Sequence, residues 1–174
     1  TSANPVCPGD DLILSTPTIQ GAVYTWSGPS GVVLGNTSSV TVANFTDKEA
    51  GTYDLTVTIP NANCTFNFNA VDIDVVAPVT AHDDTYSVFV GSTIDSMKIL
   101  ENDIFGADGI TYTLITNVSG VNDLGNGVLS YTGNAPVGRL DIMYEVCSVA
   151  CPDVCNAGVI RIFIKDTGCE FIPN

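Results

Sequence analysis

Apolar and polar residues alternate along most of this chain, which is the pattern of β-strands that bury one face. The alternation is clear at residues 11–16, where Leu12 and Leu14 share a face, and again at residues 51–59. No window keeps a helical period of 3.6 residues, so the sequence predicts no long helix. In the first half, strands are predicted at residues 11–16, 22–26, 32–34, 39–44, 51–59 and 66–75.

The last of these strands changes face part-way along its length. Phe66 and Phe68 share one parity, whereas the apolar positions from Val71 onward share the other. Because side chains alternate strictly between the two faces, a strand can change parity only with an extra residue. The sequence therefore predicts a β-bulge near residues 69–70.

The second half of the chain repeats the alternating pattern. Glycine-bounded stretches at residues 120–127 and 133–138 are interpreted as loops. The apolar stretches between such loops predict at least six strands, enough for a second sandwich. These strands are predicted at residues 85–90, 97–100, 110–116, 128–132, 142–147 and 158–165.

Residues 77–84 separate the two halves, and they combine Pro78 with small and acidic residues. Such a stretch between two β-type runs is typical of a domain boundary. The 174 residues are about right for two sandwiches of up to ~100 residues each. We therefore expect domains at residues 1–77 and 78–168, followed at 169–174 by a tail or the start of another domain. The first residue, Thr1, is interpreted as the start of a mature segment or of a piece excised from a longer chain.

The charge and the cysteine content indicate a compartment and exclude some partners. Acidic residues outnumber basic ones by 19 to 5, which gives a net charge of −14. Such a charge repels nucleic acid and anionic lipid, and it suits divalent cations. Six cysteines in so short a chain indicate an oxidising compartment. We expect a secreted, cell-surface protein that binds no nucleic acid and inserts into no membrane.

Two of the cysteines, Cys7 and Cys64, lie in the first half, so their number alone favours a disulfide between them. The expected order of strands in such a sandwich argues against this pairing, because it places the two turns that carry them at opposite ends. A disulfide needs Cα atoms within about 7 Å of each other. Both outcomes remain open at this stage.

Four cysteines lie in the second half. Cys147 ends one predicted strand and Cys155 begins the next, so a cross-strand bridge between them is the first choice. The alternative pairs Cys151 with either neighbour. Cys169 lies at the far end of the last strand, too far to reach this cluster, and its partner would lie beyond Asn174.

Catalysis finds little support in the residues. His82 is the one histidine, and it stands beside Asp83 in the predicted linker, where no nucleophile motif accompanies it. No pair of carboxylates is singled out for glycoside hydrolysis among the 19 acids. We interpret His82 as a solvated linker residue and expect the protein not to be an enzyme.

A calcium site is the more plausible chemistry. Calcium takes six to eight oxygen ligands, mainly from carboxylates and carbonyls. Asp83 and Asp84 at the linker could meet Asn102 and Asp103 of a following loop, and a bound Ca²⁺ would then stiffen the hinge. The alternative is that these are ordinary solvated turn residues. The acids at 10–11 are a weaker version of the same idea.

Two features of the first half are typical of immunoglobulin domains. Trp26 lies on the second long strand, and residues 49–53 resemble the tyrosine corner, in which the Tyr53 hydroxyl would tie a turn to the backbone. The cysteine usual two residues later is Leu55, so the inter-sheet disulfide of antibody domains is absent. Trp26 is expected in the core, the alternative being an exposed platform for sugars. The predicted fold class is all-β, with two tandem immunoglobulin-like β-sandwich domains.

Motifs over nearly the whole chain resemble the repeat regions of very large Bacteroidetes surface proteins. The first half is similar to their Ig-like or PKD-like repeats at Val6-Cys7-Pro8-Gly9-Asp10, Tyr24-Thr25-Trp26-Ser27-Gly28-Pro29, Ala50-Gly51-Thr52-Tyr53 and Asn63-Cys64-Thr65. The second half is similar to their cadherin-like repeats at Ala81-His82-Asp83-Asp84-Thr85-Tyr86, Leu100-Glu101-Asn102-Asp103-Ile104, Tyr144-Glu145-Val146-Cys147 and Cys155-Asn156-Ala157.

The end of the chain, residues 168–174, resembles the opening of the gliding-motility-associated C-terminal sorting domain, which directs export by type IX secretion. The rest of that motif would follow Asn174. The resemblance implies a secreted adhesin or filament component that acts as a stalk or link. Its partners would be neighbouring domains or subunits of the same protein, and surface glycans. The alternatives are a carbohydrate-binding module and a self-assembling fibre subunit that exchanges strands.

Overall fold

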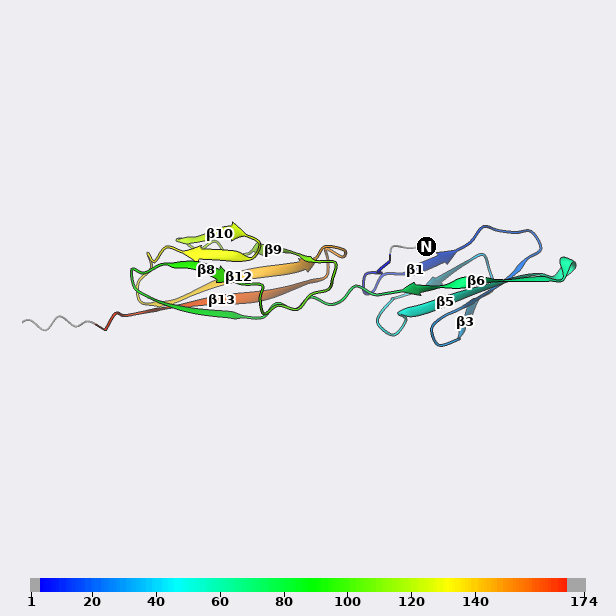
Figure 1. Cartoon of the computed structure of the whole chain (residues 1–174), viewed down its shortest axis with the longest axis horizontal. Helices are drawn as coiled ribbons and strands as arrows, with labels where there is room; N and C mark the ends of the chain where they lie inside the picture. Colours follow the sequence, from blue (N-terminus) through cyan, green and yellow to red (C-terminus); the bar gives the residue numbers. More distant parts are fainter. Residues whose placement is uncertain (1–3, 169–174) are drawn as a thin grey trace, which may run out of the picture. The chain divides into compact units, whose positions relative to one another are not determined.

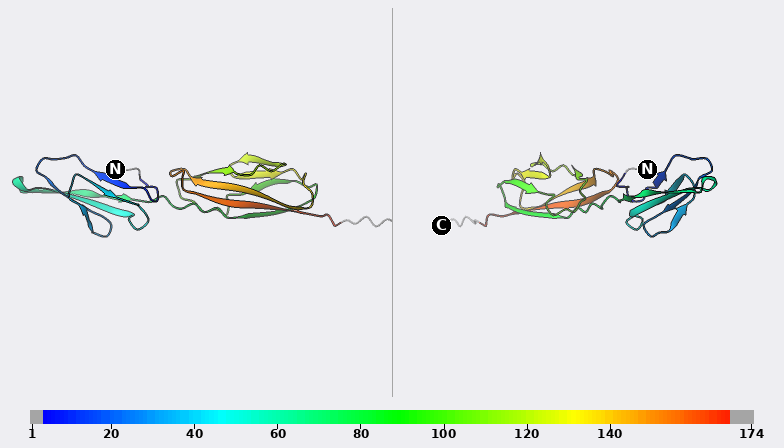
Figure 2. Two further views of the ribbon diagram at one scale, coloured as in Figure 1. Left: turned by 180° about the vertical axis from the view of Figure 1, so that it is seen from behind. Right: turned by 45° about the vertical axis from the view of Figure 1, so that its right-hand side comes forward.

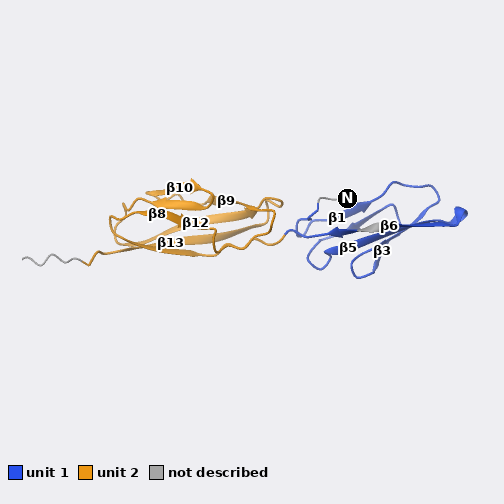
Figure 3. Ribbon diagram, in the orientation of Figure 1, with its two compact units in different colours: residues 1–76 blue, residues 77–174 orange. Residues whose placement is uncertain are grey.

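The computed structural model describes residues 4–168, apart from the side chains of residues 69 and 70 (Figure 1). The chain divides into two compact units, Thr1–Val76 and Ala77–Asn174 (Figure 3). This division falls one residue before the boundary expected from the sequence. The segment expected as a tail, residues 169–174, lies outside the described residues, and Cys169 with it.

The first unit is a sandwich of two antiparallel sheets. A four-stranded sheet in the order β3-β2-β5-β6 packs against the two-stranded sheet β1-β4. A short 3-10 turn, η1 (Pro60–Ala62), joins β5 to β6. The strands are β1 (Leu12–Ser15), β2 (Val23–Ser27), β3 (Val33–Gly35), β4 (Ser39–Val42), β5 (Gly51–Ile59) and β6 (Cys64–Ile73).

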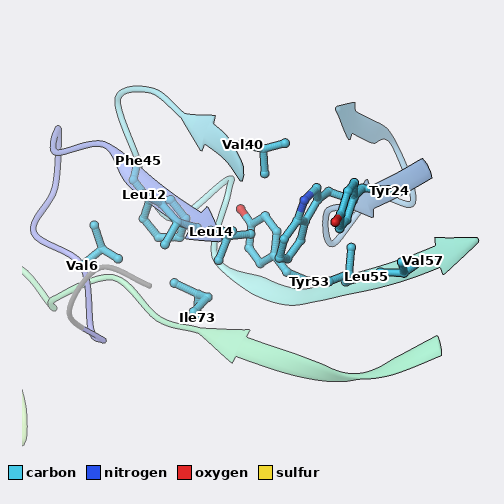
Figure 4. Close-up of a cluster of buried hydrophobic side chains, with 11 residues drawn as sticks. Val6, Leu12, Leu14, Tyr24, Val40, Phe45, Tyr53, Leu55, Val57 and Ile73 are labelled. Carbon is cyan, nitrogen blue, oxygen red and sulfur yellow. The ribbon is translucent and has the colours of Figure 1, made fainter. Parts of the chain in front are cut away.

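The core of the first unit is built from the alternating apolar positions of both sheets (Figure 4). Leu12 and Leu14 of β1 are fully buried, and they face the aromatic residues of β2 and β5. Trp26 is 5% exposed, and its Nε1 donates a hydrogen bond to the Thr37 carbonyl at 3.0 Å. Trp26 is therefore a core residue.

The change of face in β6 has the predicted cause. Tyr53 pairs with Val71 and Leu55 pairs with Phe68, so two steps along β5 match three along β6. The extra residue lies between Phe68 and Val71, where the parity of the sequence places it. The bulge returns Ile73 to the core, where it is 1% exposed.

The second unit is also a sandwich (Figure 2). One sheet has the order β7-β13-β12-β9 and the other has the order β10-β11-β8. Every paired strand is antiparallel to its neighbour except β7, which runs parallel to β13. The strands are β7 (Asp84–Phe89), β8 (Ile94–Lys98), β9 (Ile110–Leu114), β10 (Val121–Gly125), β11 (Val128–Tyr131), β12 (Gly138–Ser148) and β13 (Cys155–Lys165).

The prediction of a loop at residues 120–127 is wrong, because β10 lies there and forms a hairpin with β11. Asn126 and Gly127 connect the two strands, with φ angles of 53° and 71°. Positive φ at both central residues is the requirement of the two-residue hairpin turn that Asn-Gly favours. β10 escaped the periodicity analysis because it is largely exposed and carries few apolar residues.

The second core is separate from the first. It consists of buried apolar residues from both sheets, among them Met97 and Leu129 from one sheet and Ile142 and Ile160 from the other. Within residues 4–168, no helix is long and apolar enough to cross a membrane. Each unit is thus an all-β sandwich with its own hydrophobic core.

Candidate functional site

A buried carboxylate lies at the start of the first strand of the second unit. Asp84 is the first residue of β7, and it pairs with Ile160 of β13. It shares the inward parity of Tyr86 and Val88, and only 8% of its surface is exposed. Its Oδ2 atom is buried and has no hydrogen-bond partner among the described residues. A charged group in such a position is costly unless something pairs with it.

A second carboxylate, that of Asp103, comes to the same place from the loop that follows β8. Backbone hydrogen bonds in both directions between Thr80 and Ile104, of 2.8 and 2.9 Å, hold this loop against the segment that leads into β7. The Oδ1 atom of Asp103 accepts a hydrogen bond from the backbone N–H of His82 at 2.8 Å. The loop is therefore fixed by main-chain contacts on both sides of the carboxylate.

The hydroxyl of Tyr144, a fully buried residue of β12, contacts the Asp103 carboxylate, and the charges of Asp103 and Asp84 both act on this phenol. Its oxygen is 3.1 and 3.3 Å from the two carboxylate oxygens of Asp103. It is also 2.8 Å from the His82 carbonyl and 3.3 Å from the Ile99 carbonyl. A phenol has one hydrogen to donate, so the Tyr144 hydroxyl cannot satisfy all four of these acceptor oxygens at once.

The cross-strand neighbour of Tyr144 is Gly158 of β13, and it makes room for this ring. A Cβ atom at Gly158 would lie 2.6 Å from Cε1 of Tyr144 and 2.8 Å from its hydroxyl oxygen. Real Cβ atoms essentially never approach so closely. The glycine therefore fixes where the Tyr144 hydroxyl can lie.

Asp83 and Asn102, the other two residues expected at the metal site, make contacts outside the cluster around Tyr144. Asp83 forms an ion pair of 2.6 Å with Arg161 and accepts the backbone N–H of Val159 at 2.9 Å. Adjacent residues of an extended chain point to opposite faces, so Asp83 lies outside when Asp84 lies inside. The Asn102 side-chain amide donates to the Asp83 carbonyl at 3.3 Å and fastens the loop to the strand.

The electrostatics of the site follow from burial. The pKa of Asp84 is raised to about 6, first because burial disfavours its charged form and then because Asp103 and Asp83 repel it. The hydrogen bond from Arg161 lowers the pKa of Asp83. Burial, and then the charge of Asp103, raise the pKa of the Tyr144 phenol. Among the ion pairs of the described residues, Arg161 pairs with Asp83, and neither Asp84 nor Asp103 has a partner of opposite charge.

His82 contributes to this site through its backbone. Its N–H and its carbonyl contact Asp103 and Tyr144, while the residue itself is exposed. Sequence reasoning missed Tyr144, because an aromatic residue at an alternating position is indistinguishable from an ordinary core residue. The same reasoning missed Arg161, which is one of only five basic residues in the chain.

Another group of candidate ligands in the described part of the chain is Glu145, Cys147 and Cys155, whose ligand atoms lie within 4.8 Å of one another. Its two sulfurs are bonded to each other in a disulfide, with Cα atoms 4.1 Å apart. A disulfide leaves no thiolate for a metal. The bridge is the one that the sequence favours, and it excludes the alternative in which Cys151 takes either of these partners.

The predicted bridge between Cys7 and Cys64 is wrong, because Cys64 is an exposed free thiol. Cys64 begins β6, whereas Val6, beside Cys7, pairs with Val75 just beyond the other end of that strand. At about 3.3 Å per residue the two cysteines are roughly 30 Å apart. The topological objection raised from the sequence is the correct one.

The first unit has an open edge at β6. A cavity of about 190 Å³ opens between the sheets there, and its lining includes Leu14, Trp26, Phe68 and Val71. Phe66 and Phe68 are each 50% exposed. Among the described strands, β6 pairs only with β5, so its outer edge is bare except near its end, where the Asn4 side chain and Val6 bond to it.

Comparison with solved structures defines the fold class. Titin domains I67–I69, in an E-to-A mutated variant, match with a TM-score of 0.56 at 14% identity over 92% of this chain and 62% of that one. The three N-terminal domains of the bacteriophage RB49 outer capsid protein Hoc match with a TM-score of 0.52 at 14% identity, over 93% and 66% of the respective chains.

The chain thus consists of tandem immunoglobulin-like β-sandwich domains, as the sequence predicts. It spans about 62% of the length of the titin fragment that it matches. No family model matches the chain, and no match was found among curated proteins.

Proposed function

We propose that this chain is a non-enzymatic, extracellular segment of a longer surface protein, in which two immunoglobulin-like domains in series serve as a stalk or adhesive link. The observation that supports it is the tandem of self-contained sandwiches, each with its own core. The Cys147–Cys155 disulfide supports an oxidising compartment, since such bonds persist mainly outside the cytosol. The charge of −14 suits an exposed, soluble surface.

The sequence motifs that resemble Bacteroidetes repeat regions support a more specific proposal about the parent protein. It makes the parent protein a Bacteroidetes surface adhesin or filament, exported by type IX secretion and associated with gliding. Its partners are then neighbouring domains or subunits of the same protein, and glycans on the surface to which it adheres.

The test is to label intact source cells with antibody raised against the whole chain, followed by immunogold electron microscopy. We expect label on unpermeabilised cells, arranged along surface projections. Label that requires permeabilisation would refute the extracellular location. Label that is extracellular but scattered as single soluble molecules would refute the stalk while leaving the compartment intact.

A second candidate function is a fibre subunit that accepts a strand from another copy. The bare outer edge of β6 and the half-exposed Phe66 and Phe68 favour it, because an added strand would gain main-chain hydrogen bonds and cover both rings. Sedimentation of the whole chain at rising concentration tests this function. Assembly that is lost in Phe68→Lys, but retained when the exposed Phe89 of the second unit is changed in the same way, would support it. A monomer at all concentrations would exclude it.

A further inference from the structure

The buried and unpartnered oxygen of Asp84 is unusual within this fold. Where the burial of polar groups is described, Asp84 Oδ2 is the buried side-chain oxygen without a hydrogen bond. An unpaired buried acceptor costs about 1–3 kcal/mol, and more when it is charged. Folded proteins tolerate such a group where it serves a purpose or where an ion or water completes it.

Oxygen atoms gather around the Tyr144 hydroxyl, a group on which the charges of Asp84 and Asp103 both act. The carboxylate of Asp103 approaches through the Tyr144 hydroxyl, and the backbone carbonyls of His82 and Ile99 contact the same hydroxyl. Within residues 4–168, no ion pair is made by Asp84 or Asp103, and the nearby Arg161 pairs with Asp83. Two carboxylates without a counter-charge match the charge of a divalent cation.

We propose that Asp84 and Asp103, together with the backbone carbonyls beside the Tyr144 hydroxyl, bind a calcium ion. The donor set is entirely oxygen, which suits a hard cation and not zinc, whose sites favour imidazole and thiolate. Calcium accepts irregular geometry and mixed carboxylate and carbonyl ligands, and water fills its remaining positions. Magnesium demands near-ideal octahedral geometry and gives up its water reluctantly, so it fits this cluster less well.

The site is formed in advance by contacts that do not involve the ion. The hydrogen bonds between Thr80 and Ile104 fix the loop, Asn102 ties it to Asp83, and Gly158 sets the position of the Tyr144 ring. Because the ligands are already held in place, binding orders few groups and retains more of its intrinsic energy. The ion would link the Ile99–Ile104 loop to the start of β7.

The experiment uses the whole chain, stripped with chelator and titrated with CaCl₂ in a calorimeter and in thermal melts. Trp26 is the single tryptophan and lies in the first core, so its fluorescence reports the first unit. Tyrosines lie in both cores, so the second unit is followed by the calorimetric transition that Trp26 fluorescence does not report. We expect calcium to bind with one-to-one stoichiometry and to raise the second transition. MgCl₂ at the same concentration should have a smaller effect.

Variants assign the binding to the site. Asp84→Asn and Asp103→Asn should each weaken calcium binding by at least about tenfold, because ligand charge sets affinity in such sites. The control Asp166→Asn removes the same charge from an exposed position beyond the far end of β13, about 20 Å along the strand from Ile160. It should bind as the parent does.

A spectroscopic measurement remains informative if either variant fails to fold. Terbium(III) bound in place of calcium should emit when tyrosine is excited, because the Tyr144 phenol would lie beside it. Tyr144→Phe should lose this emission and retain calcium binding. Absence of calcium binding to the parent, or equal binding by Asp84→Asn, would overturn the proposal and leave a carboxyl that holds a proton instead.

Discussion

The tyrosine corner of the first unit allows a quantitative prediction. Tyr53 is 2% exposed, and its hydroxyl donates to the Glu49 carbonyl at 2.6 Å. That bond fastens the turn at residues 46–50 to the start of β5. The turn is closed by its own backbone hydrogen bonds and by the Glu49 carboxylate, which accepts the Thr46 N–H. In Tyr53→Phe the ring stays in the core and one buried carbonyl loses this donor.

The expected cost of this change is about 1–2 kcal/mol of unfolding free energy, between the net value of a hydrogen bond and the penalty for a buried acceptor. In a domain of this size that corresponds to a fall in melting temperature of about 4–16 °C. Denaturant titration of the whole chain, followed by Trp26 fluorescence, measures the first unit specifically. The control is Thr58→Val on the same strand, whose hydroxyl contacts Thr65 at 3.3 Å near the surface.

Thr58→Val should change stability by no more than about 0.5 kcal/mol. An equally small effect of Tyr53→Phe would refute the reasoning, since water would then be replacing the phenol. Repeating the denaturant titrations over a range of pH tests the predicted direction in which the stability difference between the two proteins changes. Burial, and then the Glu49 charge, raise the pKa of Tyr53 above 10.0. Its contribution is therefore complete below pH 10 and is lost as the pH rises through the folded-state pKa, so the two proteins should converge in alkali.

Three further predictions concern the second unit and the free thiol. Replacing Cys147 and Cys155 by serine should cost up to about 2.5 kcal/mol by the loop-entropy relation for a separation of 8, seen as a lower midpoint of the unfolding transition that Trp26 fluorescence does not report. Gly158→Ala should cost about 1–3 kcal/mol because its Cβ meets the Tyr144 ring, and it should also weaken calcium binding. Alkylation of the unreduced native protein should modify Cys64, and Cys64→Ser should leave stability within about 0.5 kcal/mol of the parent.

The alternation of apolar residues predicted most of the strands, because every second residue of a strand with one buried face is apolar. The parity change between Phe68 and Val71 even located the bulge. The same rule failed at β10, whose exposed position imposes no apolar pattern. There the Asn126-Gly127 turn was the available signal, since it depends on backbone conformation and not on burial.

The candidate site could be predicted only in part. The sequence brought the linker acids and the Asn102-Asp103 loop into one hypothesis, and in the structure the Asp103 charge contributes to the raised pKa of Asp84. Strand alternation could have separated Asp83 from Asp84 in advance, but nothing local marks Arg161 as the partner of Asp83, 78 residues away. Tyr144 depends on long-range packing in the same way. The residue types indicated an oxygen-rich cation site, whereas long-range tertiary contacts determine which side chains take part in it.

The parallel pairing of β7 and β13 has a mechanical consequence. The chain enters the second unit at one end of this pair and leaves it at the other, with six residue pairs in register from Asp84–Ile160 to Phe89–Lys165. A pull on the two ends of the unit therefore loads these hydrogen bonds in shear, so that they must break together. From residue 4 onward, the first unit has at the corresponding place the bridge between Val6 and Val75 and two hydrogen bonds of the Asn4 side chain. The β7–β13 pair therefore acts as the mechanical clamp of the second unit.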